Sequence, residues 1–141
     1  MATDLNGIPL SIKLSAGQES EIKFAQPLLD SIAVQRKSGY LKRTPKVLLG
    51  DKAYASKAFR KELRRRHIRA IIPDRSNTKR AHDGRVKFDS AAYRLRNVVE
   101  RTFGALKEKR RIATRYEKTA ENYLSMVKLG CIDLFLQLLR N

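Results

Sequence analysis

Four polar residues, Tyr93, Arg96, Glu100 and Lys107, have the types and spacing that point most clearly to a functional surface. Residues 93–107 are predicted to form one helix, and at about 100° per residue these side chains fall within a stripe of roughly 60°. The stripe presents a single carboxylate among cations. Two interpretations fit it: a functional face, or an exposed amphipathic helix in which Glu100 pairs with Arg96 for only about 0.3–0.5 kcal/mol. The apolar residues of the same helix fall on another face, which can pack: Leu95, Val98, Val99, Phe103 and Leu106.

A second candidate, Asp51, follows the short apolar run at residues 46–50 and precedes a helical pattern at 56–66. Such a run predicts a buried, parallel strand that leads into a helix. Polar residues at the carboxyl end of such strands are well placed for a site, because crevices of open α/β sheets lie there. An ordinary capping aspartate before a helix fits the same pattern.

The chain is strongly basic, with 31 Lys and Arg residues against 14 Asp and Glu residues and a formal net charge of +17. Because 42% of the residues are hydrophobic, the charge belongs to a folded domain rather than a disordered tail. A folded basic domain is most simply a nucleic-acid binder, although a ribosomal or chromatin protein carries the same signal. The dense cationic run after the predicted helix fits a solvated face or phosphate contacts, and the total charge favours phosphate contacts: Lys107, Lys109, Arg110, Arg111 and Arg115.

The length suits one α/β domain, and hydrophobic periodicity predicts the elements that would hold these residues. The expected order begins with a hairpin, whose turn is at residues 4–7 and whose second strand is at 8–14, and continues with a helix at 19–34 that Pro27 would kink or divide. A basic loop at 35–45 follows, and then strands at 46–51 and 68–73 that flank the helix at 56–66. The order ends with the helix at 93–107 and an apolar helix at 125–139. The last helix is expected to be core, under the sheet or against a second subunit. The polar segment at 74–89 fits either a DNA clamp or a loop.

The cysteine and histidine content argues against a metal site built from these residues. Cys131 is the only cysteine, so a disulfide framework within the chain is excluded, and we expect its thiol to be buried. His67 and His82 lack metal-ligand spacing and are expected at the surface. The first residues lack the pattern of a signal peptide, and Lys128 and Asp133 favour a core helix over a membrane span at the C-terminal end.

The spacing Tyr-x2-Arg-x3-Glu-x6-Lys resembles the signature of bacterial insertion-sequence DDE transposases. Further blocks are similar to the same family: TDLNGIPLSIKLSAGQ near the N-terminus, LLGDKAYASKAF around Asp51, IIPDRSN near Pro73, and KRRIATRYEK after the signature. The resemblance covers nearly the whole chain. It implies an RNase H-like mixed sheet flanked by helices, present over residues 1–141 as a partial catalytic domain whose first strand is missing.

The resemblance also implies roles for the two acids. Asp51 would be the second and Glu100 the third of three acidic ligands that hold two Mg²⁺ or Mn²⁺ ions. Ions about 3.5–4 Å apart can activate a water or a 3′-hydroxyl and stabilise the leaving oxygen. The first Asp of the family has no counterpart, because Asp4 belongs to the predicted hairpin turn. The two-metal site is therefore expected to be incomplete in this chain.

The partner implied by the resemblance is DNA, at transposon ends and target sites. The DNA contacts are expected to be Tyr93, Arg96, Lys107, Lys109, Arg110 and Arg111. The implied reaction is metal-dependent DNA cleavage and strand transfer in the bacterial cytoplasm, near the nucleoid and away from membranes. With one ligand missing, the isolated chain is expected to be inactive. An alternative is a non-catalytic basic DNA-binding or regulatory protein that forms a homodimer or inhibits or partners full-length transposase.

Overall fold

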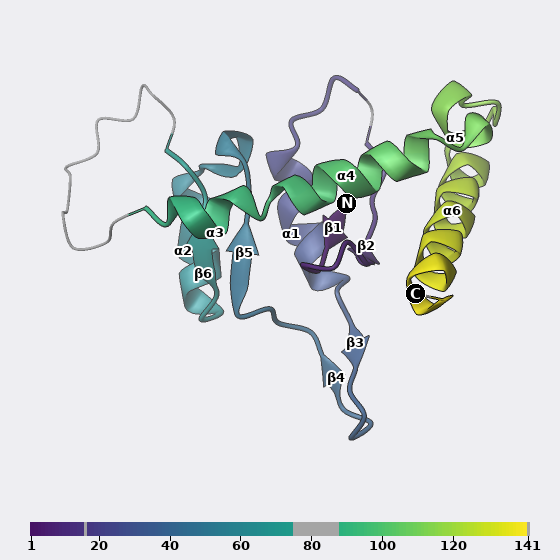
Figure 1. The fold of residues 1–141 in the computed structure, drawn as a ribbon. Helices are drawn as coiled ribbons and strands as arrows, with labels where there is room; N and C mark the ends of the chain where they lie inside the picture. Colours follow the sequence, from purple (N-terminus) through teal and green to yellow (C-terminus); the bar gives the residue numbers. More distant parts are fainter. Residues whose placement is uncertain (16, 75–87, 141) are drawn as a thin grey trace. The chain divides into compact units, whose positions relative to one another are not determined.

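The computed structural model describes residues 1–15, 17–74 and 88–140. It divides the chain into two compact units. The terminal unit consists of Met1–Ala16 and Asn97–Asn141, and the central unit is Gly17–Arg96. Figure 1 follows the helices and strands of both units along the chain.

The central unit is built around two parallel strands joined by a helix. Strand β5 (Val47–Leu49) pairs in parallel with β6 (Arg69–Ile71). Between them the chain forms the short 3₁₀ helix η1 (Lys52–Tyr54) and then α2 (Lys57–Arg65). The two strands and the helix predicted for this part of the chain are confirmed, but the prediction that the first strand is buried is wrong, because Val47 is exposed and Leu48 and Leu49 are only partly buried.

Helix α2 begins where a serine can cap it and lies against the strands through its apolar face. The hydroxyl of Ser56 accepts a hydrogen bond of 3.0 Å from the backbone N–H of Phe59, an arrangement that typically contributes about 1 kcal/mol. Leu63, on the same face, is fully buried. The buried apolar residues of this layer are Phe59, Leu63, Ile68, Ile71 and Ile72.

Helix α1 (Ile22–Asp30) is shorter than the helix predicted at 19–34, and Pro27 lies inside it without dividing it. Ala25 and Leu29 are its buried residues. The prediction of a helix is confirmed, and Pro27 does not divide it. Residues 31–33 follow the helix, and Val34, the last residue of the predicted range, begins strand β3 (Val34–Gln35).

Ion pairs connect the ends of α1 and α2 within the central unit. Arg66 lies 2.6 Å from the carboxylates of both Asp30 and Glu62. Hydrogen bonds from Arg65 and Arg66 hold the pKa of Glu62 down to about 2. These side chains connect the two helices to each other at the end of the unit opposite the carboxyl end of β5, where Asp51 lies.

The segment predicted as a basic loop forms a β-hairpin. Strand β3 (Val34–Gln35) pairs antiparallel with β4 (Leu41–Lys42). The N–H of Gly39 bonds to the carbonyl of Arg36 at 2.9 Å, and the N–H of Arg36 bonds to the carbonyl of Tyr40 at 2.9 Å. Gly39 has φ +83°, as a three-residue hairpin loop with a bulge requires. Because each strand is only two residues long, the alternation that identifies a strand was absent.

The single helix predicted at 93–107 is wrong, because the chain forms α3 (Ser90–Arg94) and α4 (Asn97–Lys107). The N–H groups of Leu95 and Arg96 bond to carbonyls three residues earlier, which closes a tight turn between the helices. Asparagine is a weak helix former that is favoured near helix starts, so a restart at residue 97 is physically reasonable. The hydrophobic periodicity across the turn is too similar to that of a continuous helix to reveal the break.

The predicted N-terminal hairpin is confirmed in the terminal unit. Strand β1 (Ala2–Thr3) pairs antiparallel with β2 (Pro9–Ser11), a strand shorter than predicted. In the turn, the carboxylate Oδ1 of Asp4 accepts hydrogen bonds of 2.9 Å from the N–H groups of Asn6 and Ile8. Asp4 therefore holds the turn, as expected for a residue that is not the missing acidic ligand.

Three helices form the core of the terminal unit. The chain continues from α4 through α5 (Arg110–Thr114) to the long α6 (Ala120–Arg140), as Figure 1 shows. Leu106, Ile112 and Val127, one from each helix, form a buried apolar cluster. Partly buried residues packed against this cluster come from α6 and from the positions next to β1 and β2: Met1, Ile12, Tyr123, Cys131 and Leu134.

The C-terminal apolar helix contributes to the core of the terminal unit on one side only, and its expected packing under the sheet or against a second subunit stays a prediction. Helix α6 packs on α4 and α5 along one side, and Val127 and Gly130 are its buried residues. Several large apolar side chains of α6 are exposed instead: Leu129, Ile132, Phe135, Leu136, Leu138 and Leu139. Among the described residues, α6 is the helix that is long and apolar enough to cross a bilayer, by length and composition only.

The architecture is mixed α/β, as predicted. The described residues contain two antiparallel strand pairs and one parallel pair, together with helices. Each of these sheets has two strands within the described ranges. The continuous RNase H-like sheet therefore stays a prediction.

Candidate functional site

Asp51 lies directly after β5, at the carboxyl end of the parallel strand pair. The preceding Gly50 continues the pairing, since its N–H bonds to the carbonyl of Ile71 at 3.2 Å. Gly50 is buried, and a Cβ atom added there would lie 3.3 Å from the Ile72 side chain. Asp51 is only partly buried, so its carboxylate stands at the edge of the packed layer. The predicted position is confirmed.

The same aspartate also caps a helix. Its Oδ1 accepts a hydrogen bond of 2.8 Å from the N–H of Ala53, at the start of η1. The capping interpretation is therefore correct as well, and the two are compatible, because one carboxylate oxygen serves the cap. The cap fixes the rotamer of a side chain that stands at a strand terminus.

Sequence reasoning missed two residues near Asp51, namely Tyr54 and Glu21. Burial, followed by the negative charge and hydrogen bond of Glu21 and the charge of Asp51, raises the pKa of Tyr54 to about 12. The Tyr54 ring also contacts Phe59, with ring centroids 6.4 Å apart. Tyr54 thus joins the end of β5 to the start of α1. Tyr54 lies close to Asp51 in the sequence, so its place beside Asp51 could be predicted. Glu21 lies 30 residues before Asp51, and no pattern in the sequence indicated its place.

Tyr93 and Arg96 are brought together as the spacing predicted, although not on one helix. Tyr93 belongs to α3, and the guanidinium carbon of Arg96, in the turn, lies 5.7 Å from its ring centroid. Phe88 contacts Tyr93, and the centroids of their two rings lie 5.3 Å apart. Asp89 caps α3 and pairs with Arg69 at 2.9 Å, which fastens the helix to β6. The pair is therefore held against the parallel strands of the central unit.

Glu100 and Lys107 lie on α4 in the terminal unit, and both are exposed. Seven residues apart, they lie on the same helix face and about 10.5 Å apart along its axis. Glu100 is in the first turn of α4, where the helix dipole favours a negative charge, and Lys107 is in the last turn, where it favours a positive one. The opposite face is held by Thr102, whose buried hydroxyl lies 3.1 Å from the carbonyl oxygen of Gly7.

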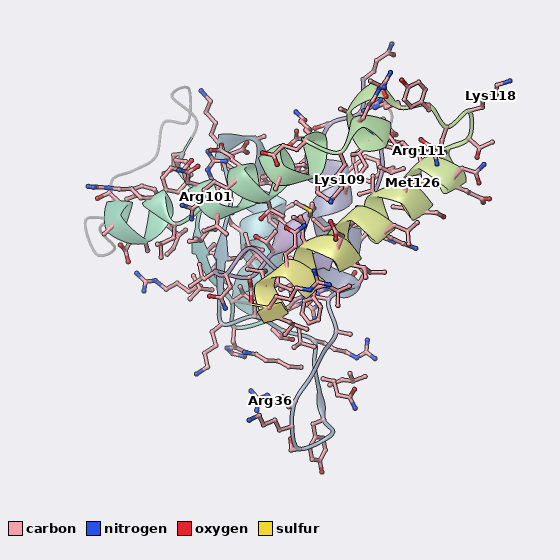
Figure 2. The ribbon with its side chains drawn as sticks, turned by 45° about the vertical axis from the view of Figure 1, so that its right-hand side comes forward. Arg36, Arg101, Lys109, Arg111, Lys118 and Met126 are labelled. Carbon is pink, nitrogen blue, oxygen red and sulfur yellow. The ribbon has the colours of Figure 1, made fainter. Side chains whose placement is uncertain are left out.

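The cationic run is partly engaged within the terminal unit. Lys109 forms an ion pair with Asp133 of α6, and Figure 2 shows Lys109 beside that helix. Arg111 Nη2 lies 3.1 Å from Glu117 Oε1, within ion-pair range but outside hydrogen-bond geometry. Arg110 is exposed. Lys109 and Arg111 thus have structural partners that the sequence did not reveal, and the predicted DNA contacts stay predictions.

The chemistry of the two acids fits a hard divalent cation in donor type, since Mg²⁺ and Mn²⁺ prefer carboxylate oxygens. Asp51 belongs to the central unit and Glu100 to the terminal unit. Over residues 1–15, 17–74 and 88–140, no group of three or more His, Cys, Asp or Glu side chains is placed to hold a metal ion. The donor types fit, but neither unit brings together enough donor side chains, among its described residues, to hold a pair of metal ions.

The remaining predictions concern isolated residues. His67 is exposed, as expected, and has φ 56° at the end of α2. Cys131 is half-buried rather than buried, and its burial raises the pKa of its thiol. His82 and most of the segment predicted at 74–89 lie outside the described residues.

The terminal unit also has an open groove, which none of the predicted site residues lines. Its walls come from the β1–β2 turn, α4 and α6, and include Leu5, Val98, Leu134 and Leu138. Arg101 is the charged residue among its lining residues, and Figure 2 shows it on α4. The groove is mainly apolar and carries no acid–base chemistry.

Fold and site together define a strongly basic α/β protein with a carboxylate at the end of a parallel strand and a second on a helix flanked by cations. The family model described as "Transposase DDE domain" matches residues 1–132. The chain belongs to this family of transposase DDE domains.

A named relative agrees with this assignment. The chain is 32% identical over 132 residues to a Burkholderia cepacia protein named "Putative transposase for insertion sequence element IS402". The match covers 93% of the chain and 58% of the relative. The chain thus spans a little more than half the length of that protein. No solved structure matches the chain.

Proposed function

We propose that the chain is part of the catalytic domain of an insertion-sequence transposase, a protein that cleaves DNA and joins DNA strands with divalent metal ions. The single observation that supports this most is the place of Asp51, at the carboxyl end of a parallel strand within a family match over residues 1–132. An RNase H-like arrangement of the strands belongs to the same proposal. So does action on DNA in the bacterial cytoplasm.

In this proposal Asp51 and Glu100 are metal ligands from separate elements. The bound Mg²⁺ ions would supply activation of the attacking oxygen and stabilisation of the leaving oxygen. The residues of the chain position the ligand and the phosphate. The hydrogen bond from the N–H of Ala53 fixes the rotamer of Asp51. Arg96, stacked on Tyr93, holds a phosphate by charge-assisted hydrogen bonds.

The metal-binding proposal is tested by calorimetric titration of Mn²⁺ into the folded chain. We expect saturable binding that is lost in both Asp51→Asn and Glu100→Gln. Glu108→Gln, an exposed acid on the segment after α4, is the matched control and should bind as the wild type does. Binding that survives both substitutions would show that these acids do not share a metal site.

A second function, a non-catalytic DNA-binding partner or inhibitor of a complete transposase, is favoured by one observation. Over residues 1–15, 17–74 and 88–140, no group of three or more His, Cys, Asp or Glu side chains is placed to hold a metal ion. The two functions differ in what Glu100 does. In a transposition assay with a complete transposase, an inhibitor should tolerate Glu100→Gln, whereas a subunit that completes an active site in trans should lose its effect.

A further inference from the structure

The β3–β4 hairpin of the central unit has no part in the site described above. Its strands pair with each other and with no third strand among the described residues. Figure 1 shows the hairpin extending away from β5, β6 and α2 on two extended connections. Both residues of β3 are exposed, as are the residues of its loop. The hairpin therefore does not serve the apolar core of the unit.

The hairpin and its connections carry only positive charge. Residues 31–50 contain five cations and no Asp or Glu: Arg36, Lys37, Lys42, Arg43 and Lys46. All except Lys42 are exposed, and Figure 2 shows Arg36 on the hairpin. Arg36 and Lys37 directly follow β3, and Lys42 lies in β4 with Arg43 after it, so the positive charge is distributed over both sides of the hairpin.

One face of the hairpin combines cations with an exposed aromatic ring. The register pairs Val34 with Lys42, and the next pair toward the loop is Arg36 with Tyr40. Side chains two residues apart on a strand share a face, so these four lie on one side of the ribbon. Tyr40 is 79% exposed, the most exposed of the large hydrophobic residues. An aromatic side chain so far from any core is suited to a ligand surface.

We propose that the β3–β4 hairpin is a DNA-binding arm, in which Arg36, Lys37, Lys42 and Arg43 contact phosphates and Tyr40 packs against sugars and base edges. This inference rests on the proposed action on DNA and names a surface for it. A two-stranded ribbon fits the major groove of a duplex, which is about 12 Å wide. Cations that follow β3 and cations in and after β4 match phosphates on both sides of the groove.

Duplex DNA fits these features better than an acidic protein does. Phosphates are spaced regularly along a duplex, so a hairpin with cations on both sides of its loop can engage several at once. An acidic protein surface would need carboxylates at matching positions and gives no particular use to an aromatic ring near the loop.

The test measures binding of the full chain to a fluorescent 30-base-pair duplex over about 50–200 mM KCl. The hairpin variant carries Arg36→Gln, Lys37→Gln, Lys42→Gln and Arg43→Gln. The matched control removes the same charge from exposed cations of α1 and α2: Lys23→Gln, Lys57→Gln, Lys61→Gln and Arg64→Gln. Each phosphate contact contributes about 0.9 to the slope of log K against log salt. We expect the hairpin variant to lower that slope by about 3 to 4 and the control to change it by less than about 1.

Single substitutions of Tyr40 separate the contribution of its aromatic ring to DNA binding from the contribution of the cations. Tyr40→Ala should weaken binding by about fivefold or more, with an unchanged salt slope, and Tyr40→Phe should bind nearly as the wild type does, because a ring contact with a nucleic acid is not electrostatic. Unchanged circular dichroism and melting temperature in each variant will show that the fold is retained.

Three outcomes would overturn the inference. If the wild type binds DNA and the hairpin and control variants have the same slope of log K against log salt, the hairpin is not a DNA-binding arm, while the proposed action on DNA stands. If the wild type binds no DNA, both fail. If polyglutamate competes with the fluorescent duplex for the hairpin as effectively as unlabelled duplex DNA does, the surface binds an acidic polypeptide.

Discussion

At the scale of single residues, Asp51 was predictable because its position depends on neighbours in sequence. An apolar run followed by a polar residue and a helical pattern determines where a strand ends, and the structure places Asp51 there. The surroundings of Asp51 were not predictable. Glu21 reaches Tyr54 through the packing of α1 beside η1, a contact between residues 33 positions apart. Contacts of this kind leave no periodic signal.

Tyr54 allows a test of this local packing in alkaline solution. Its pKa is raised from 10 to about 12 in the folded protein by burial, Glu21 and Asp51. The unfolded chain loses this proton first, so the stability that the neutral phenol contributes is complete below pH 10 and is lost as pH rises toward 12. We expect the free energy of unfolding of the wild type to fall more between pH 9.5 and 11.5 than that of Tyr54→Phe.

Urea denaturation at both pH values gives the comparison. Because Tyr54→Phe removes only this hydroxyl, the difference between the two pH dependences isolates Tyr54. Equal pH dependences would mean that burial and Glu21 do not raise the pKa of Tyr54 in the folded chain.

At the scale of elements, the sequence predicted those with long or strongly apolar patterns. The parallel pair, α2 and the first hairpin are confirmed because their apolar runs and turn residues are local signals. The β3–β4 hairpin was missed because each of its strands is only two residues long, too short to show an alternating pattern. The break before α4 was missed because Val98 and Leu106 follow α3 in nearly helical phase.

Two glycines test how α6 packs on α4 and α5. A Cβ atom at Gly130 would lie 2.6 Å from Ile112 and 3.0 Å from Leu106, whereas one at Gly104, on α4, meets nothing within 4 Å. Replacing glycine by alanine in a helix gains about 1 kcal/mol of propensity. Overpacking a core costs about 1–3 kcal/mol. We therefore expect Gly104→Ala to stabilise the protein by up to about 1 kcal/mol and Gly130→Ala to destabilise it by up to about 2 kcal/mol.

Thermal or urea unfolding of the two variants measures this difference. Both substitutions are the same chemical change in a helix, so propensity cancels between them. If Gly130→Ala stabilises the protein as much as Gly104→Ala does, the close packing of α6 on Ile112 and Leu106 is incorrect.

At the scale of the whole molecule, the family could be recognised from the sequence, but the assembly of its site could not. The match over residues 1–132 confirms the transposase family. The two predicted metal ligands, however, belong to different compact units, and convergence of such units depends on long-range packing rather than on local patterns. The same reasoning explains the exposed apolar face of α6, since a sequence shows that a helix is apolar but not what covers it.

The two-carboxylate composition of the proposed site leads to a prediction for the purified chain. A metal pair needs carboxylates that bridge and flank both ions, and Asp51 and Glu100 alone leave one ion with too few ligands. We expect no Mg²⁺- or Mn²⁺-dependent nicking of supercoiled plasmid by the 141-residue chain at protein concentrations that give full DNA binding. A gel assay with Asp51→Asn as the background control detects contaminating nuclease, because such activity is unchanged by the substitution. Nicking that requires metal and disappears in Asp51→Asn would show instead that these residues suffice for catalysis, with the remaining ligands supplied by water, by DNA phosphates or by another copy of the chain.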